Sequence, residues 1–413
     1  MTEQESTSAI ARPLSRRTVI RAAAAVIGTV AIAPGVAIAQ TAPTTPTGPV
    51  APASSTTSPP RQWGPDATNI YPDPDIISVD PSFGNLTYGN TNIKRIFHNP
   101  DAIWHEGPAW SAQGRYLVWS DVARNIQWRY ILDDGRTTEY RNPSNNSNGN
   151  TFDFEGRQIS CEHLLRRVIR WEHDGTVTVV ADSYNGQRLN SPNDVVPHPD
   201  GSIWFTDPPY GGQEPEGQVD KPGGPSNPNG HINPRIGGED YGGQQRSLPT
   251  NVYRVDPSGK LDVAVSQDQL RDPNGLAFSP DYKKLYVIST GKGPGDTVGG
   301  DGNVYVFDVA SDNKTSNMKL FTDVMVDGIK CGPDGIRADV DGNMWISSNA
   351  GSNGLGYNGV TVWSPQGQLL GRIRIPEVTA NIAFGGLKRN YLFMAASTSI
   401  YSLLLTTQGA APA

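Results

Sequence analysis

Six polar residues recur at the same position of a repeated unit, and their side-chain oxygens could hold a divalent metal ion. They are Glu106, Asn148, Asn193, Asn274, Asp334 and Asn381. Amide and carboxylate oxygens are hard ligands that suit Ca²⁺ best here, with Mg²⁺, Mn²⁺ or Zn²⁺ as alternatives. Two carboxylates would balance the charge of one such ion. Without a cation, two carboxylates confined together would raise the pKa of one of them.

Each polar residue opens a unit in which a short apolar stretch leads to a turn rich in Asp and Gly and then to a second β-prone strand. Clear copies span residues 106–114, 148–156, 193–201, 274–282 and 334–342, and a looser copy begins at 381. We expect second strands at 117–120, 159–161, 203–206, 285–289, 344–347 and 392–395. Outer strand pairs are expected at 167–171 with 176–180, 252–255 with 261–265, and 360–363 with 369–373.

Six such units predict an all-β fold, a six-bladed β-propeller with a central metal site. A sandwich or barrel is less consistent, because neither requires the same polar residue at the start of the same strand in every unit. We expect residues 93–97 to pair with the last strands near 399–405 and close the ring, which would remove exposed sheet edges. Inner strands of a propeller line its axis, so the six polar residues should converge there.

Turn chemistry offers another explanation for part of the ring. Asn, Asp and Gly are common where strands begin, because their side chains satisfy backbone groups in turns. Asn148 and Asn381 fit this explanation as well as they fit a ligand role. Glu106 fits it poorly, because Glu is not a usual turn residue.

The first residues of the chain have the features of an export signal. Residues 1–39 contain a twin-arginine pattern at Ser15–Ile20, an apolar run, and a small-residue cleavage site at Ala37–Ala39. The apolar run is marginal for a membrane span, so we expect no stable membrane anchor. Residues 40–64 are rich in Thr, Pro, Ser and Ala and are expected to be a linker. Residues 65–413 then form the propeller. The chain is expected to use the twin-arginine export machinery and to be periplasmic or secreted.

Charge and cysteine content exclude several other functions. The net charge of −7 and the pI near 5.4 leave no basic stripe for nucleic acid, so a small molecule is the expected partner. Cys161 and Cys331 are the only cysteines. Export would permit a bridge between them, two separate buried thiols are equally consistent, and we assign no function to either. No dinucleotide fingerprint, P-loop, nucleophile elbow or zinc-protease helix is present in a convincing context.

Six motifs in order resemble one family. They are Glu106–Trp110, Cys161–His163, Arg188–Asp194, Trp204–Gly211, Pro273–Gly275 and Gly332–Gly335. Together they look like the gluconolactonase branch of the gluconolactonase/regucalcin (senescence marker protein) family, over roughly residues 95–405. The resemblance implies a six-bladed lactonase fold with a metal held by Glu106, Asn274 and Asp334, and with Asn193 close to or in the coordination sphere. It also implies Asp334 as the general base.

Further candidates should lie at the mouth of the channel, where the second strands end if the inner strands begin there. They are Asp121, His163, Asp207–Tyr210, Thr290 and Asn349. His163 could contact a substrate hydroxyl or share in proton transfer, although a histidine hydrogen-bonded within a loop is commoner. The segment 211–248 is nearly free of apolar residues and is expected to be a loop over the mouth. Tyr210, His231 and Tyr241 are candidates to contact a sugar ring, and Asn193 is a candidate for either metal or substrate.

Three functions remain open on these observations. The first is a metal-dependent lactonase acting on a sugar-derived lactone such as gluconolactone. The second is a related hydrolase with the same site but another ester, lactone or phosphotriester as substrate. The third is a non-catalytic propeller in which the metal only stiffens the channel and the mouth binds a ligand or protein. Fold analogy cannot separate them.

Overall fold

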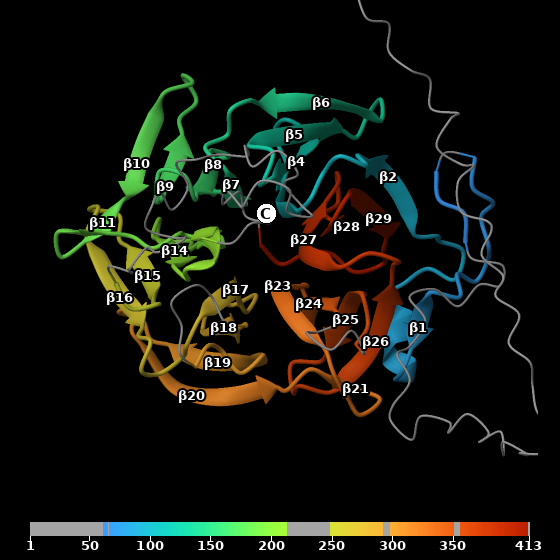
Figure 1. Ribbon diagram of the computed structural model, residues 1–413. Coiled ribbons are helices and arrows are strands. Elements are labelled where there is room, and N and C mark those ends of the chain that lie inside the picture. Colours follow the sequence, from blue (N-terminus) through green and yellow to red (C-terminus); the bar gives the residue numbers. More distant parts are fainter. Residues whose placement is uncertain (1–60, 65, 213–247, 292–297, 351–355, 412–413) are drawn as a thin grey trace, which may run out of the picture. The chain divides into compact units, whose positions relative to one another are not determined.

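Antiparallel strands make up nearly all the regular structure of the chain. The computed structural model describes residues 61–64, 66–212, 248–291, 298–350 and 356–411, all within the unit Pro49–Ala413. These residues contain no α-helix, only the short 3-10 helices η1 (Pro81–Asn85) and η2 (Tyr210–Gly212). Within the same residues, no helix is long and apolar enough to cross a membrane. The strands form sheets arranged in a ring around one axis (Figure 1).

The ring has six blades, numbered here in chain order. Blade 1 contains β3 (His105–Ser111), β4 (Tyr116–Asp121), β5 (Ile126–Ile131) and β6 (Arg136–Arg141). Blade 2 contains β7 (Ser147–Phe152), β8 (Gln158–Glu162), β9 (Arg167–Trp171) and β10 (Val177–Ala181). Blade 3 contains β13 (Val195–Pro197), β14 (Ile203–Thr206), β15 (Val252–Val255) and β16 (Leu261–Val265).

The other blades follow the same pattern. Blade 4 contains β17 (Pro273–Phe278), β18 (Lys284–Ser289), β19 (Asn303–Val309) and β20 (Thr315–Thr322). Blade 5 contains β23 (Gly332–Ala338), β24 (Met344–Asn349), β25 (Gly359–Trp363) and β26 (Leu369–Arg374), with β1 (Ile76–Ser78) added at its outer edge. Blade 6 contains β27 (Thr379–Gly385), β28 (Tyr391–Ala396), β29 (Ser399–Leu404) and β2 (Lys94–His98). The small hairpins β11 (Ser183–Tyr184) with β12 (Gln187–Arg188), and β21 (Met325–Val326) with β22 (Ile329–Lys330), lie outside the blades.

Blade 6 closes the ring with strands from both ends of the propeller. Strand β2 pairs antiparallel with β29, from Lys94 opposite Ser402 to His98 opposite Ser399. The predicted closure is therefore confirmed. Because β2, which precedes blade 1 in the chain, is the outer strand of blade 6, separating the two ends requires breaking a sheet.

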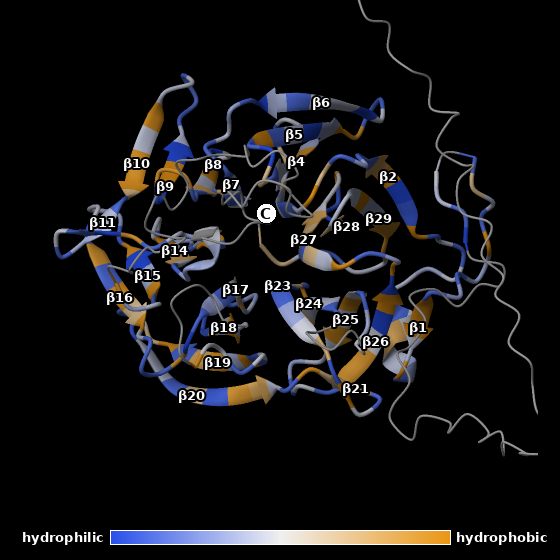
Figure 2. Cartoon of the chain, viewed as in Figure 1, coloured by the Kyte–Doolittle hydropathy of each residue, from blue (hydrophilic) through white to orange (hydrophobic). Residues whose placement is uncertain are grey.

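The hydrophobic core lies between blades rather than in one central mass. Each apolar cluster of the described residues combines side chains from two neighbouring blades. Between blades 3 and 4, for example, Trp204 packs edge-on against Phe278 at 5.3 Å, and between blades 5 and 6 Trp345 meets Phe384 at 5.5 Å. Figure 2 shows hydrophobic segments spread over the blades all around the ring. Each blade therefore holds its two neighbours in place.

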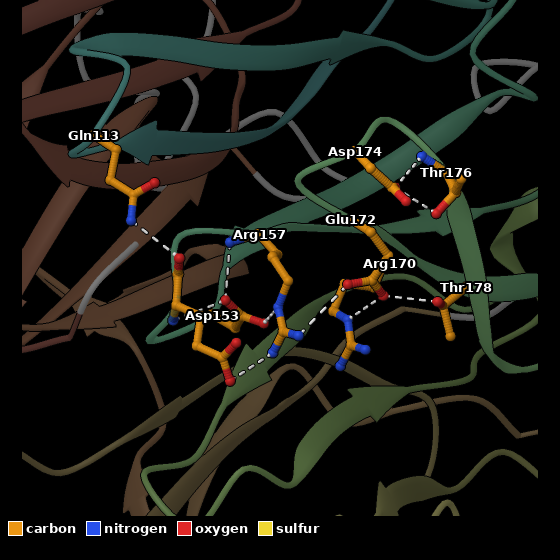
Figure 3. Close-up of polar contacts among 9 residues, drawn as sticks. Gln113, Asp153, Arg157, Arg170, Glu172, Asp174, Thr176 and Thr178 are labelled. Carbon is orange, nitrogen blue, oxygen red and sulfur yellow. Dashed lines mark hydrogen bonds and ion pairs between the residues drawn. The ribbon is translucent and has the colours of Figure 1, made fainter.

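The interface between blades 1 and 2 is polar instead. Its apolar cluster has only Ala109, Val118 and Phe152 as buried members. Gln127 donates to Asn150 at 2.8 Å within a buried side-chain network. On the face where the inner strands end, the Gln113 side chain of blade 1 donates to the Glu155 carbonyl of blade 2 at 3.0 Å. Ion pairs around Arg157 extend this contact along the blade 2 turns (Figure 3).

Contacts with the propeller begin before residue 65. Arg61 Nη1 lies 2.8 Å from a carboxylate oxygen of Asp73, and Trp63 packs edge-on against Tyr401 at 5.1 Å. The last residues of the segment expected to be a linker are thus part of the folded unit. The rest of that segment, and the expected signal at residues 1–39, lie outside the described residues.

The inner strands carry a bulge at the start of the unit, which turns the ring residues toward the axis. Five of these strands shift register there: β3, β7, β17, β23 and β27. In β17 the shift leaves Asn274 and Gly275 without a partner residue. Such an extra residue bends a strand and redirects its side chain. A Cβ on Gly275 would lie 2.2 Å from the Asp334 carbonyl oxygen, so glycine is required where the next blade passes.

Replacing Gly275 with alanine should therefore push blades 4 and 5 apart. We expect Gly275→Ala to lower the free energy of unfolding by about 1–3 kcal/mol or more. The matched control is Gly84→Ala, because a Cβ there meets nothing within 4 Å. Urea unfolding of both variants tests this, and equal stability of the two would contradict the close approach.

Candidate functional site

The six ring residues lie side by side in chain order around the axis. A Cβ on the glycine that follows each ring residue in blades 1, 2 and 4 would lie 2.0–2.2 Å from the backbone carbonyl oxygen of the next blade's ring residue, and a Cβ on Gly335 would lie 2.1 Å from the Asn381 Oδ1. Glu106 and Asn381 close the circle, because the Asn381 side chain hydrogen-bonds to the Glu106 carboxylate. The segments that carry the ring residues are thus direct neighbours at five of the six steps. At the remaining step, from blade 3 to blade 4, the Tyr210 hydroxyl bonds to the Asp272 carbonyl at 3.3 Å.

Hydroxyl groups of the second strands fix the ring from behind. Ser120 of β4 donates to the Asn148 carbonyl at 2.9 Å, and Ser347 of β24 donates to the Ala380 carbonyl at 2.7 Å. Thr290, just after β18, donates to the Pro333 carbonyl at 2.7 Å. Each bond joins one blade to the backbone of the next, beside or at a ring residue. These hydroxyl groups, which lie outside the ring, therefore help to fix the positions of the ring residues.

Glu106 is buried in an electrostatically crowded place. Burial raises the pKa of the Glu106 carboxyl well above its ordinary value, and the negative charges of Asp334 and Asp194 raise this pKa further. The Gly107 amide donates to its Oε2 at 2.5 Å, and this bond and the Asn381 side chain act in the opposite direction. A cation near this carboxylate would relieve the repulsion.

Two amide side chains complete a plausible ligand set. Asn193 is only 3% exposed, and its Oδ1 has no hydrogen-bond partner among the described residues. A buried amide oxygen without a partner costs free energy unless something else binds it. Asn274 is 5% exposed and stands in the bulge of β17. These amides, with the carboxylates of Glu106 and Asp334, fit a divalent ion that takes oxygen ligands.

The amides are necessary for such a site. In the described part of the chain, no group of three or more His, Cys, Asp and Glu residues is placed to hold a metal. The ring itself has only two carboxylates, so any ion there depends on Asn oxygens. Asn381 has another role, since its Oδ1 accepts the Ile382 amide at 2.8 Å while its side chain also bonds to Glu106.

Strand register places the starts of the inner strands and the ends of the second strands on one face of the ring, the face expected to be the mouth. Residues that start the inner strands pair with residues that end the second strands, as Glu106 does with Ser120 and Gly332 does with Asn349. Asp121, however, is fully buried between blades, where its carboxylate lies 3.7 Å from His105 Nε2. The strand places this side chain on the sheet face opposite that of Ser120, where it is buried and not exposed at the mouth.

His163 and Tyr210 both lie at the mouth, in close packing. The His163 ring abuts the blade 3 loop, because a Cβ on Gly211 would lie 3.0 Å from its Cγ and 2.6 Å from the Ser191 Cβ. Tyr210 is 6% exposed, and its hydroxyl donates to the Thr290 carbonyl. Tyr210 therefore offers a substrate little beyond its ring edge. His231, Tyr241 and most of the segment 211–248 lie outside the described residues.

A buried carboxylate beneath the mouth was not singled out for its charge in the sequence. Asp207 follows β14, and burial raises its pKa from 3.8 to about 7, although hydrogen bonds and Arg166 act against this shift. Its Oδ2 accepts the Asn190 amide at 2.8 Å, and the Asn190 side chain donates to the Asp207 carbonyl at 3.1 Å. Asp207 thus organises the loop that carries Asn193.

The sequence reasoning also missed an ion pair inside the channel. Asp194 of blade 3 pairs with Arg337 of blade 5 at 3.1 Å, and both side chains are buried. The available signal was an acidic residue where four other units have glycine. Cys161 and Cys331 are both buried and free, so they form separate thiols.

The fold and site together define a six-bladed propeller with a carboxylate- and amide-lined channel. Residues 104–398 match the family model described as SMP-30/Gluconolactonase/LRE-like region. The chain belongs to this family. The resemblance seen in the sequence motifs is therefore confirmed.

Known relatives agree with this assignment. Gluconolactonase of Zymomonas mobilis subsp. mobilis is 28% identical over 330 residues, which cover 75% of this chain and 80% of that protein. A solved gluconolactonase from Xanthomonas campestris is 29% identical with a TM-score of 0.64, covering 84% of this chain and 98% of that one. The calcium-binding protein regucalcin from Agrobacterium tumefaciens shares the fold, with 16% identity, a TM-score of 0.56, and coverage of 76% and 94%.

Asp207 predicts a pH dependence of stability. Between about pH 4 and pH 7 the folded state keeps a proton on Asp207 that the unfolded state has lost, so stability falls as pH rises through this window. Asp207→Asn should flatten that fall and raise the free energy of unfolding at pH 8 by up to about 4 kcal/mol. Urea unfolding across pH measures it. Asp268→Asn, at an exposed position, should behave as wild type, and an unchanged slope in Asp207→Asn would refute the account.

Proposed function

We propose that this chain is a lactonase that opens a sugar-derived lactone to its hydroxy acid at a divalent-metal site in the channel. The observation that carries the proposal is the orphaned Oδ1 of buried Asn193 in a ring with the crowded carboxylate of Glu106. The relatives named gluconolactonase and lactonohydrolase support hydrolysis of a lactone. The choice of a gluconolactone-like substrate follows their names.

Glu106, Asn193, Asn274 and Asp334 would hold the ion, most simply Ca²⁺, because all four offer oxygens. Mg²⁺, Mn²⁺ and Zn²⁺ remain alternatives for such a set. When bound, the ion supplies a Lewis acid that polarises the lactone carbonyl. The likeness to regucalcin concerns the fold alone, so the ligand set rests on the residues themselves.

Asp334 is assigned the role of general base. It is the only ring residue that is half-buried, whereas the other five are buried. Asp334 takes a proton from the attacking water, the bond between the acyl carbon and the ring oxygen breaks, and that oxygen leaves as a hydroxyl after gaining a proton. Glu106, oriented by Asn381, contributes charge and not proton transfer.

Residues at the mouth would orient the substrate. Asn193 lies between ring and mouth and would contact the metal or a substrate oxygen. His163, packed against Ser191 and Gly211, would bond a substrate hydroxyl or deliver the proton to the leaving oxygen. Tyr210 would shape the wall with its ring, because its hydroxyl proton is used by the backbone.

Export belongs to the proposal as well. The twin-arginine pattern at Ser15–Ile20 and the cleavage site at Ala37–Ala39 support a periplasmic or secreted enzyme delivered by the twin-arginine machinery. Replacing Arg16 and Arg17 with lysine and following the protein in cell fractions would test this.

Asp334→Asn should lower kcat for gluconolactone by at least about a hundredfold, because the amide cannot accept the proton. The change preserves size, so the fold should survive. Asp341→Asn is the matched control, because Asp341 is exposed in the turn that follows the same strand. A pH-indicator assay with thermal melts tests both variants. An active Asp334→Asn enzyme would contradict the assignment of Asp334 as the general base.

Stripping the metal should abolish hydrolysis, and one added divalent ion should restore it. The assay uses a panel of lactones, esters and a phosphotriester, with chelator and with Ca²⁺, Mg²⁺, Mn²⁺ or Zn²⁺ returned singly. Glu106→Gln should need a higher ion concentration, because it removes one of two ligand charges. If Ca²⁺ raises the melting temperature while no compound is hydrolysed, the non-catalytic binding function replaces this proposal.

A further inference from the structure

Blade 3 departs from the repeat in a way that the proposed reaction does not explain. In blades 1, 2, 4 and 5 the ring residue is followed by glycine, but in blade 3 Asn193 is followed by Asp194. Asp194 is fully buried. A carboxylate placed there adds a third negative charge to the channel, and its field acts on Glu106.

Arg337 forms an ion pair with Asp194 from the opposite side of the channel. Its Nη1 lies 3.1 Å and its Nη2 3.4 Å from the two carboxylate oxygens of Asp194. Arg337 belongs to β23 and Asp194 directly precedes β13, so blade 4 lies between them in the ring. The two side chains therefore meet inside the channel. A two-pronged pair of this kind fixes geometry as well as charge.

The pair lies just beneath the proposed metal ligands. Asp194 follows Asn193 directly, and Arg337 comes three residues after Asp334 on the same strand. The Asp194 Oδ1 also accepts the Val195 amide at 3.0 Å, which ties the carboxylate to its own strand. Arg337 further donates to the Ile336 carbonyl at 2.7 Å. Both ends are anchored beside ring residues, so the pair links Asn193 to Asp334.

A pocket lies beside this pair, next to the last described residues of the chain. Arg337 lines a pocket with Phe278, Phe384 and the C-terminal residues Gly409–Ala411. The Ala410 amide donates to the Ala338 carbonyl at 3.0 Å, and Figure 1 shows the C-terminal end at the centre of the ring. Asp194 and Arg337 are themselves buried, so bulk water screens their charges little and each acts strongly on an ion in the ring.

We propose that Arg337, through Asp194, is a positioning residue that sets the net charge of the channel to suit a divalent cation. Glu106, Asp334 and Asp194 with one guanidinium leave a net charge of two negatives, whereas losing Arg337 would leave three. The inference rests on the proposed metal site. Arg337 is not among the proposed ligands or substrate contacts; it neutralises Asp194 and holds the loop segment that carries Asn193.

The test compares Ca²⁺ with trivalent Tb³⁺ on the purified, metal-stripped full chain, by calorimetry and terbium luminescence. Arg337→Met should raise the ratio of Tb³⁺ to Ca²⁺ affinity by about tenfold or more, because the added negative charge favours the more highly charged ion. Arg337→Lys keeps the charge and should keep the wild-type ratio. Arg337→Met with Asp194→Asn removes both charges and should also restore it.

A second variant and the wild-type protein also test the role of Arg337. Asp194→Asn alone should lower the ratio, and it provides the answer if Arg337→Met does not fold. A wild-type ratio in folded Arg337→Met, or in Asp194→Asn, would overturn this inference while leaving the metal site intact. If wild-type protein binds neither ion, the metal site fails and this inference fails with it.

Discussion

Burying Glu106 among other carboxylates costs free energy, and much of the channel's construction opposes that cost. The Gly107 amide and the Asn381 side chain bond to its carboxylate, and Arg337 neutralises Asp194 nearby. These contacts reduce the repulsion without removing it, since the pKa of Glu106 stays well above its ordinary value. A buried carboxylate with a strongly raised pKa is typical of functional sites. The proposed ion supplies that charge.

The need to hold these carboxylates close together also explains features of the fold beyond the carboxylates themselves. Ring residues reach the axis because the inner strands bulge, and the bulges fit because glycine follows the ring residue where the next blade passes. Serine and threonine hydroxyls from the second strands then fix the blades to one another. Interblade packing and the closing pair of β2 with β29 hold this geometry. The propeller is thus a frame that keeps like charges close together.

Much of the fold and of the ring could be predicted from the sequence, because the repeated unit indicates both the strands and the ring residues. The Asp-Gly turns and apolar runs located the strands, and the spacing of Glu106, Asn274 and Asp334 predicted their convergence. Side-chain direction could not be predicted so well. Asp121 ends a strand at the expected mouth, yet its side chain is buried beside His105, and the hydroxyl of Tyr210 bonds to the backbone.

The repeated unit could not predict contacts between residues that are distant in the chain. Asp194 and Arg337 lie in different units, and only the closed ring brings them together. Likewise, Asn381 bonds to Glu106 across the junction of the last and first blades. The anchoring of Arg61 and Trp63 was missed because the residues before them are typical of a linker. In each case the sequence pattern describes a single segment, whereas the contact forms between two segments that only the fold brings together.

The central claim is that the channel ring holds one divalent ion. Crystals of the purified chain grown with Ca²⁺ and with Mn²⁺ test it most directly, because anomalous scattering from Mn²⁺ locates the ion independently of the model of the chain. The account predicts one peak on the axis, with oxygens of Glu106, Asn193, Asn274 and Asp334 within about 2.0–2.6 Å of the ion. Absence of a peak in the ring, or an ion bound elsewhere while the ring holds only water, would contradict it.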